Sequence, residues 1–221
     1  MPSATHRPRP RLLAAGLLAA LLAGCGSASP QELPPAAGPD SSPPAAVEPV
    51  GRVSADGLLP LGLGPIGAAR TAVDGGARQA VVDGRAREVL LSETGATEPL
   101  ARADAGVGPT RALSNGRWLW VLDTRGDALL VYRVQPELEL SRRVYLPGAP
   151  FALALDPVKQ RLWVTLTATN EVVEFPAHGR PTALRRFPTV RQPDQVGVDG
   201  ERGLVYVRGA DGLQRFSPGP L

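Results

Sequence analysis

Short apolar runs separated by turn-forming residues dominate the chain from Gly51 onward. Residues 118–122 read Trp-Leu-Trp-Val-Leu without a polar side chain, and residues 162–164 read Leu-Trp-Val. Runs this short, bounded by Gly, Pro, Asn and Asp, predict strands rather than helices. A strand that is apolar on both faces is typical of one buried between two layers. The pattern therefore predicts an all-β domain.

The apolar pattern repeats along the chain. The aromatic residues Trp120, Trp163 and Tyr206, each flanked by aliphatic residues, stand 43 residues apart. Other pairs that keep this spacing are Asp127 and Asn170, Tyr132 and Phe175, Arg142-Arg143 and Arg185-Arg186, Pro150 and Pro193, and Asp156 and Asp199. A fainter copy at residues 81–83 and 90–91 precedes them by 40 residues. Agreement along a whole unit indicates a structural repeat.

Each unit contains four short apolar segments. In the third unit the predicted strands are residues 151–156, 161–166, 171–175 and 183–187. Four antiparallel strands in 40–45 residues are typical of a propeller blade, a small sheet stacked beside its neighbours. The sequence therefore predicts a small β-propeller of about four blades, at residues 65–106, 107–147, 148–190 and 191–221.

The last unit contains only three predicted strands. Residues 51–63 precede the first unit and include Val53, Leu58, Leu59 and Leu61. We therefore expect this segment to supply the fourth strand of the last blade and close the ring, which would cover exposed sheet edges. An open fan of sheets that dimerises, and a β-sandwich, are the alternatives.

A basic and then apolar segment begins the chain. Three arginines lie within residues 7–11, and residues 12–22 are an uninterrupted run of Leu, Ala and Gly. This run is too short to span a bilayer, which needs about 20 residues, but it suits the apolar region of a secretory signal. The alternative for Cys25 is a small buried residue in a signal anchor.

The end of the run, Leu22-Ala23-Gly24-Cys25, resembles the lipobox of bacterial lipoproteins. This resemblance implies that residues 1–24 are a signal peptide and that Cys25 becomes the first residue and carries lipid, including palmitate-type acyl chains. Two acyl chains give stable anchoring where one gives marginal binding. The expected location is the extracytoplasmic face of the cell membrane, with the membrane as a partner through Cys25.

A proline-rich segment follows the cysteine. Residues 26–50 contain seven prolines and no aromatic residue. Such a composition cannot bury a core, so residues 25–50 are expected to be a disordered tether carrying the lipidated cysteine. The domain organisation predicted is thus a signal peptide at 1–24, a tether at 25–50 and a propeller-like domain at 51–221.

One resemblance concerns the repeat itself. Leu162-Trp163-Val164-Thr165, followed by residues 170–175, is similar to the YVTN-type repeat, in which a strand, a polar turn and a second strand recur. The resemblance covers roughly residues 107–216 and implies a propeller of a kind that is commonly extracytoplasmic. The chain departs from the pattern because its aromatic residue is Trp twice and its turn differs in each unit.

Charge and reactive side chains limit the function classes. The chain has 24 Lys and Arg against 21 Asp and Glu, but residues 1–24 hold three arginines and no acid, so the mature chain is formally neutral. A neutral domain gives no electrostatic reason to bind nucleic acid. Cys25 is the only cysteine, and His178 is the only histidine after the signal. We therefore expect no disulfide, no thiol nucleophile, no cofactor and no metal site.

The candidate site lies in the loops that join one blade to the next, at the mouth of the central channel. The most polar of these, residues 189–194, contains Arg191, Gln192 and Asp194, and Arg70 and Arg111 are expected to face the same mouth. The planar arginine fork binds carboxylates bidentately, so a pocket for an anionic or glycan ligand is the more specific of two interpretations of these residues. The alternative is a set of solvated loops with ordinary ion pairs.

Two function classes follow from this reading. The favoured one is a non-enzymatic binding or interaction module, whose partner is an unknown protein or cell-envelope ligand. The alternative is a propeller hydrolase of the lactonase kind, which needs several carboxylates and usually a divalent cation at the channel. The tryptophans Trp118, Trp120 and Trp163 are interpreted as packing residues between blades rather than as a platform for stacking sugars.

Deletion of residues 51–62 tests ring closure. If these residues supply the missing strand, the shortened chain should unfold at a lower temperature, because an unpaired sheet edge replaces backbone hydrogen bonds. Thermal denaturation followed by circular dichroism measures the change. An unchanged melting temperature would contradict closure by this segment.

Overall fold

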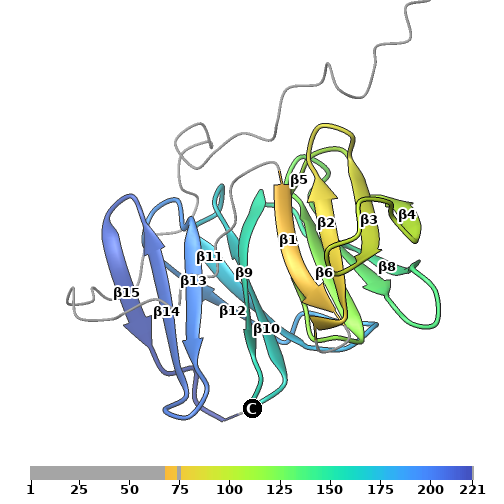
Figure 1. Ribbon diagram of the computed structural model, residues 1–221. Helices are drawn as coiled ribbons and strands as arrows, with labels where there is room; N and C mark the ends of the chain where they lie inside the picture. The colour runs from red at the N-terminus through yellow and green to blue at the C-terminus, as the bar shows by residue number, and fades with distance from the viewer. Residues whose placement is uncertain (1–67, 74–75, 221) are drawn as a thin grey trace, which may run out of the picture.

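The computed structural model describes residues 68–73 and 76–220, which form four antiparallel sheets (Figure 1). The strands are β1 (Ala68–Val73), β2 (Arg78–Asp83), β3 (Glu88–Glu93), β4 (Ala101–Asp104), β5 (Pro109–Ser114), β6 (Trp118–Asp123), β7 (Ala128–Arg133), β8 (Glu139–Tyr145), β9 (Pro150–Asp156), β10 (Arg161–Leu166), β11 (Glu171–Pro176), β12 (Arg185–Pro188), β13 (Gln195–Asp199), β14 (Leu204–Gly209) and β15 (Gly212–Phe216). Each sheet contains consecutive strands, so we call β1–β4, β5–β8, β9–β12 and β13–β15 the first to fourth blades.

The predicted units agree with the observed sheets. The boundaries of β10 coincide with the predicted strand, and β9 and β11 differ from prediction by one residue each. The fourth blade contains three strands among the described residues. The predictions for Cys25, the tether and residues 51–63 fall outside the described part of the chain. Within that part, no helix has the length and apolar character that a membrane crossing requires.

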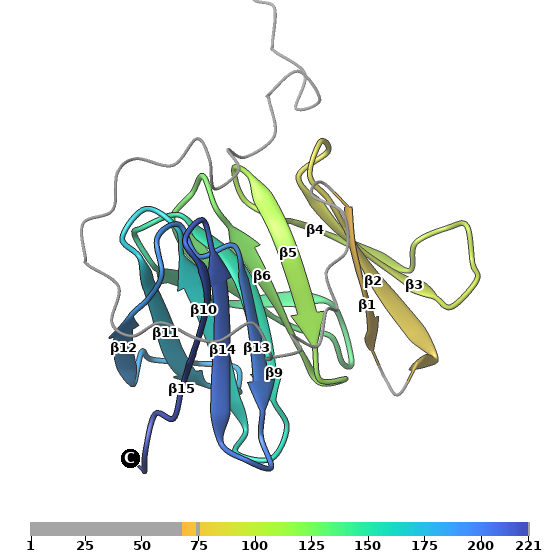
Figure 2. The same cartoon turned by 90° about the vertical axis from the view of Figure 1, so that its left-hand side faces the viewer.

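The innermost strand of each blade packs against that of the next. β1 contacts β5, β5 contacts β9, and β9 contacts β13. Figures 1 and 2 both show these strands as a row, with the remaining strands of each blade fanning away from it. In the described part of the chain, β13 and β1 do not pack against each other in the same way. The four blades therefore lie in series.

Apolar cores fill the space between successive blades. The first core combines Val82 and Leu91 of the first blade with Leu130 and Tyr132 of the second. The second core lies between the second and third blades, and the third core lies between the third and fourth. β6 shows how one strand serves two cores, because Leu119 and Val121 face the first and Trp120 and Leu122 face the second. All four side chains are 0 % exposed, as the two-sided apolar pattern predicts.

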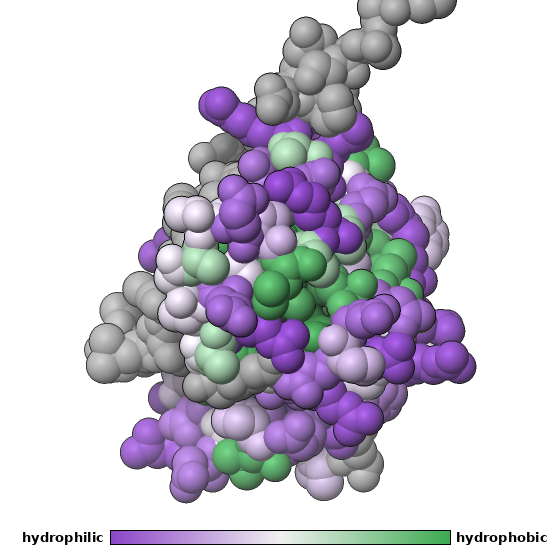
Figure 3. Space-filling model, turned by 45° about the vertical axis from the view of Figure 1, so that its right-hand side comes forward, coloured by the Kyte–Doolittle hydropathy of each residue, from purple (hydrophilic) through white to green (hydrophobic). Residues whose placement is uncertain are grey.

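The cross-strand pair Val81 and Leu90 marks the outer side of the first blade. Their neighbours Ala80 and Leu91 point into the first core, so this pair points to the opposite face and is half-buried. Figure 3 shows the side of the molecule on which the first blade lies, with hydrophobic atoms gathered near its centre and hydrophilic side chains around them. The series of blades ends at this face.

Left-handed backbone recurs at equivalent turns. Gly106, Ala149 and Gln192 stand 43 residues apart, each in the loop that leads to the next blade, and their φ angles are 90°, 57° and 50°. A second set lies in the turn after the second strand, where Asp127 and Asn170 have φ angles of 45° and 55°. Asn and Asp tolerate this conformation better than other non-glycine residues. The repeat therefore extends from side chains to backbone conformation.

The two residues Asp127 and Asn170 connect these turns. The Oδ1 atom of Asp127 accepts hydrogen bonds from the amides of Gly148 and Ala149, at 3.2 and 3.0 Å. The Oδ1 atom of Asn170 accepts one from the amide of Gln192 at 2.7 Å. Each side chain thus holds the loop that leaves its own blade, which explains why the sequence keeps Asp or Asn at this spacing.

A pH-dependent prediction concerns Tyr132. Its hydroxyl is buried in the first core and donates to the carbonyl of Asp104 in β4. Burial, followed by the charges of Asp104 and Asp123, raises the pKa of Tyr132 above its ordinary value. The unfolded chain loses this proton near pH 10 while the folded chain keeps it, so stability should fall as the pH rises above 10, by up to about 1.4 kcal/mol per pH unit.

Tyr132→Phe should remove the part of the stability loss above pH 10 that comes from this hydroxyl. At neutral pH it should cost about 1 kcal/mol, because one hydrogen bond is lost. Urea denaturation at pH 7 and pH 11 measures both effects. The control is Tyr145→Phe, since Tyr145 is 74 % exposed. Equal alkaline destabilisation of the wild-type and Tyr132→Phe proteins would contradict the prediction.

Candidate functional site: the loops at the channel mouth

The loop between β12 and β13, residues 189–194, contains the three predicted ligand-binding residues. Its backbone is held at several points: the Thr189 amide donates to the carbonyl of Asn170 at 2.8 Å, and the Val190 amide donates to Gln214 Oε1 at 2.9 Å. The carbonyl of Arg191 accepts from the amide of Ala210 at 2.8 Å. The loop is therefore tied to both the third and the fourth blades.

The structure places the three predicted side chains in different surroundings. The Nε atom of Arg191 lies 3.4 Å from Asp211 Oδ1, and both side chains are about half-exposed, which makes this a weak surface pair. The backbone amide of Gln192 donates its hydrogen bond to Asn170 Oδ1. Asp194 donates its amide to the carbonyl of Arg208 at 2.9 Å, and its carboxylate lies 3.8 Å from Arg208 Nε. The loop residues are thus first of all structural, and their role in binding a ligand stays a prediction.

Arg111 of β5 is the buried cation of this region. It is 8 % exposed, and its guanidinium lies over the ring of Phe151 of β9, 5.4 Å from the ring centre. Its Nη1 atom donates to the carbonyl of Thr110 at 3.2 Å, while its Nε atom has no acceptor among the described residues. Burial lowers the pKa of Arg111, and the charge of Asp194 partly opposes this effect. Arg111 therefore connects the second and third blades at the mouth.

Two threonines support the same end of the second and third blades. The hydroxyls of Thr110 and Thr124 are 2.7 Å apart, and Thr124 Oγ1 donates to the carbonyl of Pro150 at 2.6 Å. Both threonines are buried. They join the start of β5 to the start of β9 and so fix the distance between Arg111 and Phe151. The sequence did not single them out, although the repeat places Thr167 at the position equivalent to Thr124.

A desolvated guanidinium with a free donor favours an anionic partner. Arginine is weakly hydrated and presents its donors in a planar fork that matches a carboxylate. Among the described residues, no three His, Cys, Asp or Glu side chains come together as a set that could hold a metal ion. The unused Nε donor of Arg111 is thus the group of this region whose chemistry matches an anion.

The three tryptophans and the histidine of the domain support the packing of blades and turns. Trp120 and Trp163 are 0 % and 2 % exposed, which confirms that they pack between blades. Trp118 is half-buried beside Gly179 of the third blade, where an added Cβ would clash with its ring. His178 Nδ1 accepts from the amide of Arg180 within its own turn. Trp120 and Trp163 are thus core residues between blades, and the side chain of His178 supports its own turn.

Asp156 and Asp199 end the first strands of their blades. Asp156 Oδ1 accepts from the amides of Val158 and Lys159, and Asp199 Oδ1 accepts from the amide of Arg202. The hydrogen bond from the Arg202 amide, followed by the hydrogen bond and charge of the Arg202 side chain, lowers the pKa of Asp199. The interpretation of both aspartates as turn caps is confirmed.

The chain matches no family model, and no curated protein sequence matches it. Solved structures do match. The periplasmic gluconolactonase of Pseudomonas aeruginosa is similar over 68 % of this chain and 49 % of its own, with a TM-score of 0.58 and 20 % identity. The Swd1 β-propeller domain of Myceliophteria thermophila is similar over 68 % of this chain and 53 % of its own, with a TM-score of 0.57 and 12 % identity. Hydrazine synthase of Kuenenia stuttgartiensis is similar over 71 % of this chain and 45 % of its own, with a TM-score of 0.57 and 14 % identity.

These likenesses concern the fold, since every identity is low. The chain spans about half the length of the solved structures that it matches. Its four sheets of three or four antiparallel strands, stacked in series, correspond to the blades of those proteins. The described part of this chain therefore has the fold of a β-propeller with about four blades.

Proposed function

We propose that this protein is a lipid-anchored binding module on the extracytoplasmic face of the cell membrane, and that it holds an anionic ligand at the channel mouth. The observation that carries the ligand class is Arg111, a buried cation with an unused Nε donor beside Phe151. The lipid on Cys25 and the tether at residues 25–50 are inferred from the lipobox resemblance. The YVTN-type repeat agrees with this location and stays a prediction.

The rigid mouth supports a binding role. Ligand sites are usually preformed, with few polar groups placed on a fixed scaffold. Here the loop at 189–194 is tied by Asn170 and Gln214, and Arg111 is held by Phe151 and the carbonyl of Thr110. A carboxylate at Arg111 would supply the acceptor that Nε lacks. An acidic sugar of the cell envelope has this chemistry.

A lactonase-like hydrolase is the second candidate. The observation that favours it is the likeness to the periplasmic gluconolactonase, which has a related fold. Fold does not determine function, so the two candidates are separated by activity. Hydrolysis of glucono-1,5-lactone by the purified chain, followed by acid release in a pH-stat, would favour the hydrolase.

Lipid anchoring is tested at Cys25. The wild-type chain, expressed in a bacterium that processes lipoproteins, should sediment with membranes and incorporate radiolabelled palmitate. Cys25→Ser should lose the label and be recovered with the soluble extracytoplasmic fraction or as the unprocessed precursor, because no thiol remains to accept the lipid. An unlabelled wild-type protein that retains residues 1–24 would contradict the anchor.

Ligand binding is tested at Arg111 with gluconate as the probe. Calorimetry should show saturable binding to the wild-type chain, and Arg111→Gln should weaken it by about tenfold or more, as expected for a charge-assisted hydrogen bond. Arg111→Lys should lie between the two, because it keeps the charge but not the fork. Arg117→Gln is the matched control, since Arg117 is exposed and stacks on Trp118. Equal affinity of Arg111→Gln and wild type would exclude this site.

A further inference from the structure

One buried position breaks the apolar pattern of the repeat. Leu91, Val131 and Glu174 occupy the same place in the third strand of the first, second and third blades. They pair with Ala80, Trp120 and Trp163 of the second strands, which are also equivalent. Leu91 and Val131 belong to the first and second cores. Glu174 is 2 % exposed and faces the fourth blade from a position where the other blades carry an aliphatic side chain.

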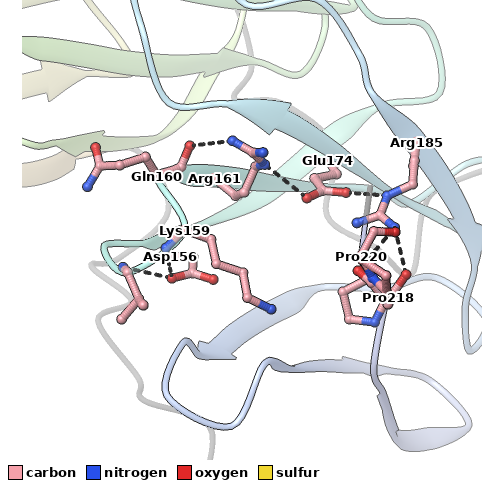
Figure 4. A network of polar contacts seen from close by, with 10 residues as sticks. Asp156, Lys159, Gln160, Arg161, Glu174, Arg185, Pro218 and Pro220 are labelled. Carbon is pink, nitrogen blue, oxygen red and sulfur yellow. Dashed lines mark hydrogen bonds and ion pairs between the residues drawn. The ribbon is translucent and has the colours of Figure 1, made fainter.

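Two arginines hold the carboxylate of Glu174. Arg161 Nε lies 3.3 Å from Oε1, and Arg185 Nε lies 2.7 Å from Oε2. Arg185 also donates through Nη1 to the carbonyls of Pro218 and Pro220, at 2.6 and 3.2 Å. Figure 4 shows Glu174 between the two guanidinium groups, with Pro218 and Pro220 on the far side of Arg185. Arg185 is therefore turned partly inward.

The repeat does not require a charge at this position. An aliphatic residue fills the same position in the other two blades, and a buried ion pair is often replaced by apolar residues with no loss of stability. Departures from an otherwise consistent pattern are expected at functional sites. The buried carboxylate and its two arginines therefore indicate a function at the interface of the third and fourth blades.

A cavity opens beside the network. It has a volume of about 580 Å³ and lies between the third and fourth blades, where Arg161, Trp163 and Glu174 face Val198 and Val205. Cavities of roughly 300–1,000 Å³ are of the size that holds small molecules. Arg161 begins β10 while the loop at 189–194 lies beyond the other end of that strand. The cavity is thus at the opposite end of the blades from the channel mouth.

The lining of the cavity carries a net positive charge. Its cationic side chains are Lys159, Arg161, Arg185 and Arg202, and its anionic ones are Asp156 and Glu174. Glu174 holds two of the arginines, and Asp199 holds Arg202 at 3.0 Å. Lys159 Nζ makes no ion pair or hydrogen bond with the described residues, and Figure 4 shows its side chain extending towards the space between Glu174 and residues 218–220.

We propose that this cavity is a second ligand site, which takes a small carboxylate with an apolar or aromatic body. Lys159 binds the carboxylate, because it is the lining cation that no acid neutralises. Trp163, Val198 and Val205 contact the apolar body, and the Glu174 network fixes the polar wall. The site goes beyond the function proposed above, because it uses none of the residues at the channel mouth.

The chain offers a specific probe of this site. Lys159 is its only lysine, so the full chain labelled with ¹³C at the lysine Cε carbon gives one side-chain NMR signal. Titration with benzoate should shift this signal saturably at constant ionic strength. Benzyl alcohol, which lacks the charge, and inorganic phosphate, which lacks the apolar body, should shift it much less.

Two variants should change the affinity in opposite directions. Lys159→Gln should weaken benzoate binding about fivefold, because it removes one cation at an exposed position. Glu174→Gln should strengthen it by a similar factor, because it removes one anion from the buried wall of the cavity. Affinities are followed on the indole signal of Trp163, assigned with Trp163→Phe. Arg180→Gln is the control, since Arg180 is exposed and lies outside the cavity; its affinity should equal that of the wild type.

A merely structural network would give another result. If Lys159→Gln binds benzoate as the wild type does, or if Glu174→Gln folds and binds more weakly, the proposal is overturned. It is also overturned if the lysine signal does not saturate with benzoate, or if phosphate binds as tightly. Unchanged binding of gluconate at the channel mouth in Lys159→Gln separates the failure of this site from that of the first.

Discussion

Burial of each sheet on both faces by its neighbours is the constraint on which this structure depends. Alternate residues of β6 and β7 enter different cores, so the second blade cannot be stable alone: its apolar side chains need both the first and the third blades. Each large side chain that is fully buried contributes about 1.5–3 kcal/mol relative to exposure. A shift of one residue in strand pairing would exchange the two sets and bring polar neighbours such as Arg133 into a core. The same packing therefore fixes both the order of the blades and the register within them.

Packing between blades leaves the ends of the strands free to carry chemistry. At the channel mouth the repeat supplies Asp127 and Asn170, which hold the loops leaving their blades. The position of Arg111 beside Phe151 follows from the scaffold, because Arg111 belongs to β5 and Phe151 to β9. A buried guanidinium held between two blades is a preorganised donor, which lowers the entropic cost of binding an anion.

The sequence predicted the fold better than the sites. The 43-residue period and the apolar runs predicted both ends of β10 correctly, because they reflect local sequence pattern and burial between similar blades. The direction of Arg191 could not be read in this way, since it depends on Asp211 in a separate turn and on the left-handed backbone of Gln192. Glu174 escaped notice because a single charge in a strand suggests a solvent-facing position. Leu91 and Val131 stand at the same place in the repeat and indicate that residue 174 is buried. The strand register shows that the three positions are equivalent.

The position of the Glu174 network also explains how a charged cluster can lie between two blades without opening the core. The rings of Trp163, Phe187 and Phe216 form a cluster with centres 5.1–6.2 Å apart in the middle of the interface. Val172 and Val207 of the same core are fully buried, while Arg161 and Arg185 remain partly exposed and keep some hydration. The desolvation that makes buried ion pairs unfavourable is therefore confined to one carboxylate with two cationic partners. A propeller interface can thus acquire a polar site at its end, provided that an aromatic layer closes the apolar part first.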